Sequence, residues 1–237
     1  WKGATTVSLT KLSSNLNLRK AISLSIDKNE LVNRVVASPG TRRSDSMFHD
    51  WMTLGDTKLI DLIPPPAHQK NIPEAKRYLE VARKQLNISG NIKLTLTIND
   101  SGTSRRVAEY IQHELLSVGI ELVIDPQVTQ MMVEKWRSGI SDLTLLTWPV
   151  DVDDPMDQIS FMGNPDFREV FQGLYAEQDM ASLFYLTRDA LTIAAKVAAI
   201  KDVQVLFDKK VTVLPLFESY GTAIVSRKLK GFVWQPV

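Results

Sequence analysis

The alternation of apolar and polar residues changes its period in the middle of the chain, and this change predicts a βαβ unit. Residues 92–98 (IKLTLTI) alternate with the period of two that is typical of a strand. Residues 103–118 place apolar side chains every three or four positions, which predicts an amphipathic helix ended by Gly119. Residues 120–124 (IELVI) predict a second strand. This order is a right-handed crossover, so the sheet is expected to be at least partly parallel.

The same reading predicts helices and strands on both sides of this unit. Strands are expected over 5–12 and 143–147, and over 211–217, where Pro215 indicates an edge or a strand end. Asp27 is expected to cap a helix that ends near Pro39-Gly40, with Glu30 in a capping-box relation. Residues 39–73, rich in proline, predict a long irregular segment, and Ala223–Ser226 is short and β-like. The other helices are expected over 17–26, 72–86, 129–138, 165–178 and 188–209. The predicted class is therefore α/β, with a mixed, partly parallel sheet flanked by helices.

Composition excludes several classes of function. With 237 residues and 44% hydrophobic content, the chain can build one core or at most two small ones. Its 28 Lys and Arg nearly balance 27 Asp and Glu, which gives no electrostatic reason to expect a nucleic acid or a membrane surface as partner. The absence of cysteine excludes disulfides, Cys-ligated zinc, iron–sulfur clusters and thiol catalysis. The opening Trp1-Lys2-Gly3 is not typical of a signal peptide, so a mature product or a piece of a longer protein is expected.

The sequence contains no recognisable catalytic or metal-binding motif. His49, His68 and His113 do not stand at spacings such as His-x3-His. There is no Gly-x-Ser-x-Gly sequence and no glycine-rich phosphate loop. The turn at Asp100-Ser101-Gly102 could meet an anion, but a turn with a helix cap at Ser101 or Thr103 is favoured. We therefore expect no enzyme activity, no cofactor and no metal site.

The segment WPVDVDDP (148–155) is the most unusual part of the chain. It follows a predicted strand that ends at Thr147, where open α/β sheets place ligand-contacting loops. It holds three carboxylates, Asp151, Asp153 and Asp154. A calcium loop would need ligands at alternating positions, then a Gly and a distal Glu, and Pro155 and the missing Gly argue against it. Residue types alone favour an acidic surface turn, and they do not show whether two carboxylates share a pocket.

Several segments resemble one family along nearly the whole chain. These segments are LRKAISLSIDKNELVNRVV (18–36), IPEAKRYLEVA (72–82), LTLTIND with RRVAEYIQHELLSVGIELVI (94–124), WPVDVDDP (148–155), LPLF (214–217) and KGFVWQP (230–236). In this order they are similar to the second, distal lobe of the oligopeptide-, dipeptide- and nickel-binding proteins of ABC importers. Thr147 stands where the family often has Gly, and residues 155–214 match poorly. The resemblance implies a class II periplasmic-binding-protein-like lobe, with residues 1–237 as a single lobe and the first lobe absent from this chain.

The resemblance also implies a ligand site in the WPVDVDDP segment. Asp151 would pair with the α-ammonium of a peptide, and a buried charged hydrogen bond of this kind fixes one end of a peptide regardless of its sequence. Trp148 and Val150 would contribute to the ligand site beside it, and Trp148 can supply apolar contact area. Asp154 and Pro155 are expected to shape the turn rather than touch the ligand.

Two function classes remain open at this point. The first is a transport receptor for a peptide or another small solute such as nickel, haem or a sugar conjugate. Its partners would be the first lobe of the same protein and the membrane subunits of an ABC transporter, and its place would be periplasmic or extracellular at the membrane. The second is the ligand-sensing part of a cytoplasmic transcription regulator, in which a separate domain would bind DNA.

Overall fold

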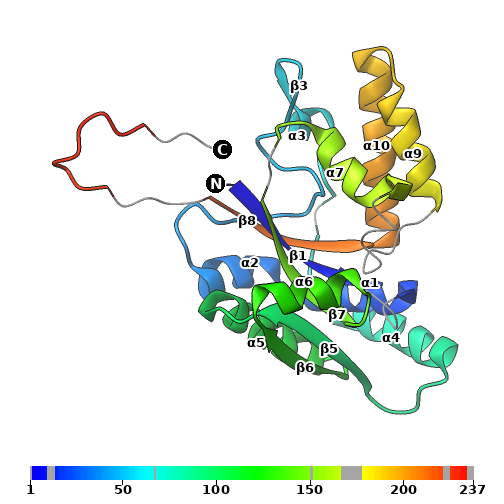
Figure 1. Ribbon diagram of the computed structural model, residues 1–237. Coiled ribbons are helices and arrows are strands. Elements are labelled where there is room, and N and C mark those ends of the chain that lie inside the picture. The colour runs from blue at the N-terminus through cyan, green and yellow to red at the C-terminus, as the bar shows by residue number, and fades with distance from the viewer. Residues whose placement is uncertain are drawn as a thin grey trace.

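A six-stranded mixed sheet organises the chain, with strand order β2-β8-β1-β7-β5-β6 (Figure 1). The computed structural model describes residues 2–9, 14–66, 68–149, 152–166, 178–220 and 225–233, with the backbone alone at 2–9, 148–149 and 178. β5 is parallel to both β6 and β7, whereas β1 is antiparallel to β7 and β8, and β8 is antiparallel to β2. The strands are β1 (Lys2–Leu9), β2 (Arg42–Arg43), β5 (Ile92–Asn99), β6 (Ile120–Gln127), β7 (Leu143–Pro149) and β8 (Val213–Tyr220).

The predicted βαβ unit is confirmed. β5 and β6 pair in parallel from Ile92↔Ile120 onward, and α5 (Gly102–Leu116) connects them. The apolar face of α5 is buried, since Val107, Ile111 and Leu115 are each at most 1% exposed. The chain then turns at Gly119, whose φ of +94° suits a residue without a side chain.

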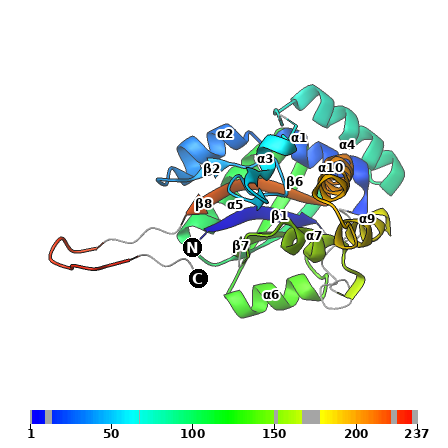
Figure 2. The same cartoon turned by 90° about the horizontal axis from the view of Figure 1, so that it is seen from above.

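Two layers of helices cover the sheet, one on each face (Figure 2). The larger core lies on the face covered by α1 (Leu16–Ser25), α4 (Ile72–Leu86) and α5, and it includes Leu143 and Leu145 of β7. Leu146 points to the opposite face, where it packs against Met132 and Trp136 of α6 (Thr129–Arg137). Alternate residues of β7 therefore serve two cores, as expected for a strand with both faces covered.

Local capping explains where the first helices begin. Asp27 accepts hydrogen bonds from the backbone N–H groups of Asn29 and Glu30, so the predicted cap is confirmed. The predicted capping box is not formed. The Asp27 N–H donates to Glu114 Oε2 at 3.3 Å and not to the side chain of Glu30. The helix α2 (Lys28–Glu30) continues as a π-helical turn, η2 (Leu31–Val36). In α4, Pro73 lies in the first turn as predicted.

The irregular segment between residues 39 and 71 contributes to a second core. It includes β2, a small hairpin of β3 (Thr53–Leu54) and β4 (Thr57–Lys58), and the short helix α3 (Leu59–Leu62). Its apolar residues pack against α7 (Pro155–Gly163), α9 (Gln178–Arg188) and α10 (Ile193–Lys210). Those apolar residues are Met47, Phe48, Met52, Leu59 and Ile63.

The last third of the chain differs most from the sequence expectations. The helix expected over 165–178 lies mostly outside the described residues, and two helices not expected there, α7 and α9, flank that gap. The helix expected from 188 begins at 193, after a turn, and Thr192 caps it. Pro215 lies where the register of β8 against β1 shifts, and β2 pairs with β8 only at Phe217 and Glu218, so Pro215 keeps an open side as predicted. Residues 221–224 are outside the described part, and 225–226 form no strand.

Candidate ligand-binding edge of the sheet

Four strands begin or end at one edge of the sheet. β5 and β7 are parallel, so their carboxyl ends lie at the same edge. The start of β1 lies there too, because Gly3 pairs with Pro149 of β7. The end of β8 joins them, since Lys2 pairs with Tyr220. The loop after β7 therefore emerges where the chain enters β1 and leaves β8.

The three predicted ligand residues belong to the end of β7 and the residues that directly follow it in the sequence, and the structure does not describe their side chains. Asp151 and Val150 fall outside the described residues. The backbone of Trp148 is part of β7 and pairs with Ala4. The ligand-binding roles of all three stay predictions.

The two remaining carboxylates of the loop have structural partners. Asp154 caps α7 by accepting a hydrogen bond from the Met156 N–H at 2.8 Å, and Pro155 occupies the first turn. This confirms that Asp154 and Pro155 shape the turn. Asp153 is exposed and accepts a hydrogen bond from the Thr53 N–H of the β3–β4 hairpin at 3.3 Å. The loop is thus tied to a helix on one side and to a hairpin on the other.

A cavity of about 520 Å³ lies beside this edge. Its walls come from β7 and β8, from the loop after η2, and from the first turns of α5. Several of its residues carry hydroxyl groups, among them Thr41, Ser104, Thr147 and Ser219. Ser101 accepts a hydrogen bond from the Ser104 N–H, so the predicted cap at Ser101 is confirmed. The cavity offers hydrogen-bonding groups beside Thr147 of β7 and has a volume typical of small-molecule sites.

An aromatic cluster at the end of β8 was missed by sequence reasoning. The rings of His49 and Trp51 stack with centroids 4.5 Å apart, and Trp51 lies 5.7 Å from Tyr220. The Tyr220 hydroxyl donates to Asp50 Oδ1 at 3.3 Å, and burial together with that carboxylate raises the tyrosine pKa. The only local signal was the apolar and aromatic run around Trp51, and Tyr220 lies 169 positions further along the sequence.

The three histidines lie in three different environments. His49 is buried, with Nδ1 3.2 Å from Glu218 Oε1. His113 is exposed on α5. Burial and the nearby charge of Lys28 lower the pKa of His68 to about 4. Within the described residues, no group of three or more His, Asp or Glu side chains could hold a metal ion.

Comparison with known proteins identifies the class that this fold and edge define. Residues 8–167 match the family described as bacterial extracellular solute-binding proteins, family 5 Middle, and the chain belongs to that family.

Individual relatives agree with this assignment. The chain is 24% identical to the peptide transport periplasmic protein SapA of Salmonella typhimurium, over 94% of this chain and 40% of that protein. It is also 24% identical to the dipeptide-binding protein DppE of Bacillus subtilis, over 94% of this chain and 41% of that protein. The chain therefore spans about 40% of the length of these relatives.

Solved structures show the same fold. The crystal structure of a peptide-binding protein of a peptide ABC transporter superposes with a TM-score of 0.80 at 20% identity, over 93% of this chain and 100% of that one. The pheromone receptor PrgZ superposes with a TM-score of 0.78 at 21% identity, over 91% of this chain and 42% of that one. These likenesses confirm the periplasmic-binding-protein-like α/β class. No helix in the described part of the chain combines the length and the apolar character needed to cross a membrane.

Proposed function

We propose that this chain is the distal lobe of a solute-binding protein that delivers peptides to an ABC importer. The family membership and the named functions of SapA and DppE support a role in binding and transport rather than in catalysis. In this proposal residues 1–237 form one lobe, and a first lobe outside this chain completes the ligand site. The membrane subunits of the transporter are the further partners, and the protein works in the periplasm or outside the cell at the membrane.

The observation that carries the proposal is the convergence at one sheet edge. β7 ends there and leads into the WPVDVDDP loop, and β1 begins and β8 ends there. In this proposal another lobe is connected near the start of β1 and the end of β8, and it would therefore lie over the loop. A ligand held between the lobes would then be enclosed and shielded from water, which strengthens its charged contacts.

Asp151 is the proposed anchor for the peptide α-ammonium. Its neighbours Asp153 and Asp154 already hold the loop, through Thr53 and through the cap of α7. The assignment of Asp151 to the ligand comes from the resemblance to the family, and the structural roles of Asp153 and Asp154 support it. Trp148 and Val150 are proposed to line the same site.

The test compares two variants of the parent protein that contains both lobes. Asp151→Asn keeps the side-chain shape and removes the charge, and it should weaken peptide binding about 30-fold or more, because one partner of a buried ion pair is lost. Asp153→Asn is the matched control, since its amide oxygen can still accept the Thr53 N–H. It should change peptide affinity less than about 5-fold. Calorimetry showing equal losses for both variants would reduce the loop to a generally acidic surface and contradict the proposal.

A further inference from the structure

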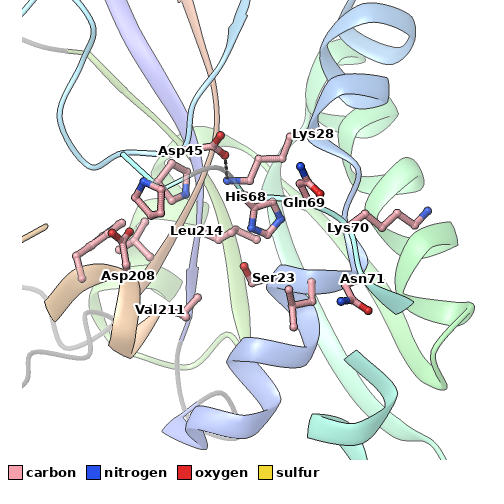
Figure 3. A pocket seen from close by; sticks show the side chains of 15 residues that line it. Ser23, Lys28, Asp45, His68, Gln69, Lys70, Asn71, Asp208, Val211 and Leu214 are labelled. Atoms are coloured by element: carbon pink, nitrogen blue, oxygen red, sulfur yellow. Dashed lines mark hydrogen bonds and ion pairs between the residues drawn. The ribbon is translucent and has the colours of Figure 1, made fainter. Parts of the chain in front are cut away.

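A second cavity, of about 390 Å³, lies away from the ligand-binding edge (Figure 3). It sits at the start of β8, and Val213 there pairs with Ser8 at the far end of β1, opposite to Tyr220. The end of α10, part of α1 and residues 68–71 form the other walls. Its volume falls within the range of small-molecule sites.

One wall of this cavity presents a carboxylate that forms no direct ion pair with a cation of the described residues. Asp208, near the end of α10, is half-buried and accepts a hydrogen bond from Gln204 Nε2 at 2.8 Å on the same helix. Within the described residues, no Lys, Arg or His nitrogen lies within 4.0 Å of its oxygens. Burial raises the pKa of Asp208 to about 6, although the more distant charge of Lys28 acts in the opposite direction. A positively charged group in the cavity would supply that missing partner.

Another wall has a net positive charge, because Lys28 and Asp45 line the cavity and Arg43, outside its lining, also pairs with Asp45. Lys28 is buried, and its Nζ donates to the Ser44 carbonyl at 3.1 Å and to Asp45 Oδ1 at 2.9 Å. The other oxygen of Asp45 pairs with Arg43 at 2.6 Å, so two cations share one carboxylate. An ammonium group has three protons, and these two bonds use two of them. His68 lines the cavity between the walls and is neutral at physiological pH, because its pKa is lowered to about 4.

The remaining surface of the cavity is mostly apolar. Its polar residues are Ser23, Gln69, Asn71 and Lys70, and Lys70 pairs with Glu114 at 2.5 Å. Figure 3 shows Lys28 and Asp45 on one side of the cavity and Asp208 on another, with Leu214 and Val211 between and below them. The apolar wall is formed by Leu24, Phe207, Val211, Val213, Leu214 and Pro215.

We propose that this cavity binds a free α-amino acid with an apolar side chain. Its ammonium group would pair with Asp208, its carboxylate would lie at the positive wall around Lys28, and its side chain would contact the apolar wall. A zwitterion matches a cavity whose two walls carry opposite net charges, since each charge then meets its complement. This site is separate from the proposed peptide site at the other edge of the sheet.

The probes for this site are L-leucine and two analogues that each lack one charge. Calorimetry on the chain should detect L-leucine, and leucinamide and N-acetyl-L-leucine should each bind at least about 10-fold more weakly. Asp208→Asn should weaken L-leucine binding about 10- to 100-fold, because a charged hydrogen bond is lost. Asp202→Asn is the matched control, since Asp202 is exposed on the same helix and does not line the cavity. It should leave the L-leucine affinity unchanged.

Three outcomes would overturn the proposal. The first is no binding of L-leucine at about 10 mM to a chain that unfolds cooperatively on heating, and so is folded. The second is an equal effect of Asp208→Asn and Asp202→Asn. The third is displacement of L-leucine by excess tripeptide in the two-lobed parent, which would place L-leucine at the peptide site. A failure of the peptide proposal would leave the comparison of Asp208 with Asp202 intact.

Discussion

Replacing Asp208 with Asn should raise the free energy of unfolding at pH 7 and leave it unchanged below about pH 4. Burial raises the pKa of this carboxyl from 3.8 to about 6. The folded chain therefore holds the proton more tightly than the unfolded chain, and ionisation between these two values disfavours the folded state. For a fully buried group, this difference in pKa would correspond to about 3 kcal/mol of unfolding free energy. Asp208 is only half-buried, and solvent screening reduces the expected gain to about 1 kcal/mol.

His68 acts in the opposite direction within the same pH range. Its pKa is lowered from 6.5 to about 4, so the folded chain holds this proton less tightly than the unfolded chain. The contribution of neutral His68 to the stability of the folded state is complete above pH 6.5 and is lost as the pH falls toward 4. The two groups therefore oppose each other in the wild-type chain. Without the Asp208 carboxyl, stability should rise more steeply with pH.

Urea unfolding at several pH values between about 4 and 7 measures both effects. Asp208→Asn should show a steeper rise of stability with pH than the wild type, whereas His68→Gln should show a fall. Asp202→Asn, at an exposed position of the same helix, should follow the wild type. A pH slope of Asp208→Asn identical to that of the wild type, or a lower stability at pH 7, would refute the reasoning.

The remaining predictions concern binding by the lobe and two local features. The isolated chain should bind peptides weakly or undetectably, because the other face of the ligand stays in water, and submicromolar binding in calorimetry would show that the chain holds a complete site. Asp45→Asn should lower the free energy of unfolding by about 3 kcal/mol or more in urea titrations, because it leaves the charge of Lys28 buried without its carboxylate partner. A loss below about 1 kcal/mol would show that water reaches Lys28. Val211→Gly should raise the midpoint of thermal unfolding and stabilise the folded chain by about 1 kcal/mol, because Val211 has a φ of +47°, a backbone conformation that is costly for a branched residue. A lower midpoint would show that the loss of the buried side chain outweighs the relief of backbone strain.

Elements that depend on local sequence were predictable. The βαβ unit follows from a switch of periodicity within 92–124, and most of its apolar positions are buried as the period requires. Leu116 and Val123 are exceptions, since they are 58% and 59% exposed. The caps at Asp27 and Ser101 follow from residue type and position alone. Their interactions span only a few residues, so no knowledge of the tertiary structure was needed.

Elements that depend on distant partners were not predictable. The 39–73 segment has no clear period, because its apolar residues fill a core made with α7, α9 and α10 rather than one regular face. The predicted start of α10 was wrong. The apolar residues of the turn before Ile193 continue the helical pattern in the sequence, but Leu191 in that turn is 98% exposed and belongs to no helix.

The candidate sites depend even more on tertiary structure. The cluster of His49, Trp51 and Tyr220 joins positions far apart in the chain, as does the cavity between Lys28 and Asp208. The structural roles of Asp153 and Asp154 show how the loop is held, and the assignment of Asp151 stays a prediction from the family pattern.

The most direct test of the central claim is a double-mutant cycle on peptide affinity in the two-lobed parent protein. The cycle combines Asp151→Asn with acetylation of the peptide N-terminus. Each change alone should cost about 2–5 kcal/mol, and both together should cost much less than their sum, because both remove the same interaction. Additive losses, or an affinity that ignores acetylation, would contradict the assignment of Asp151 as the anchor of the peptide.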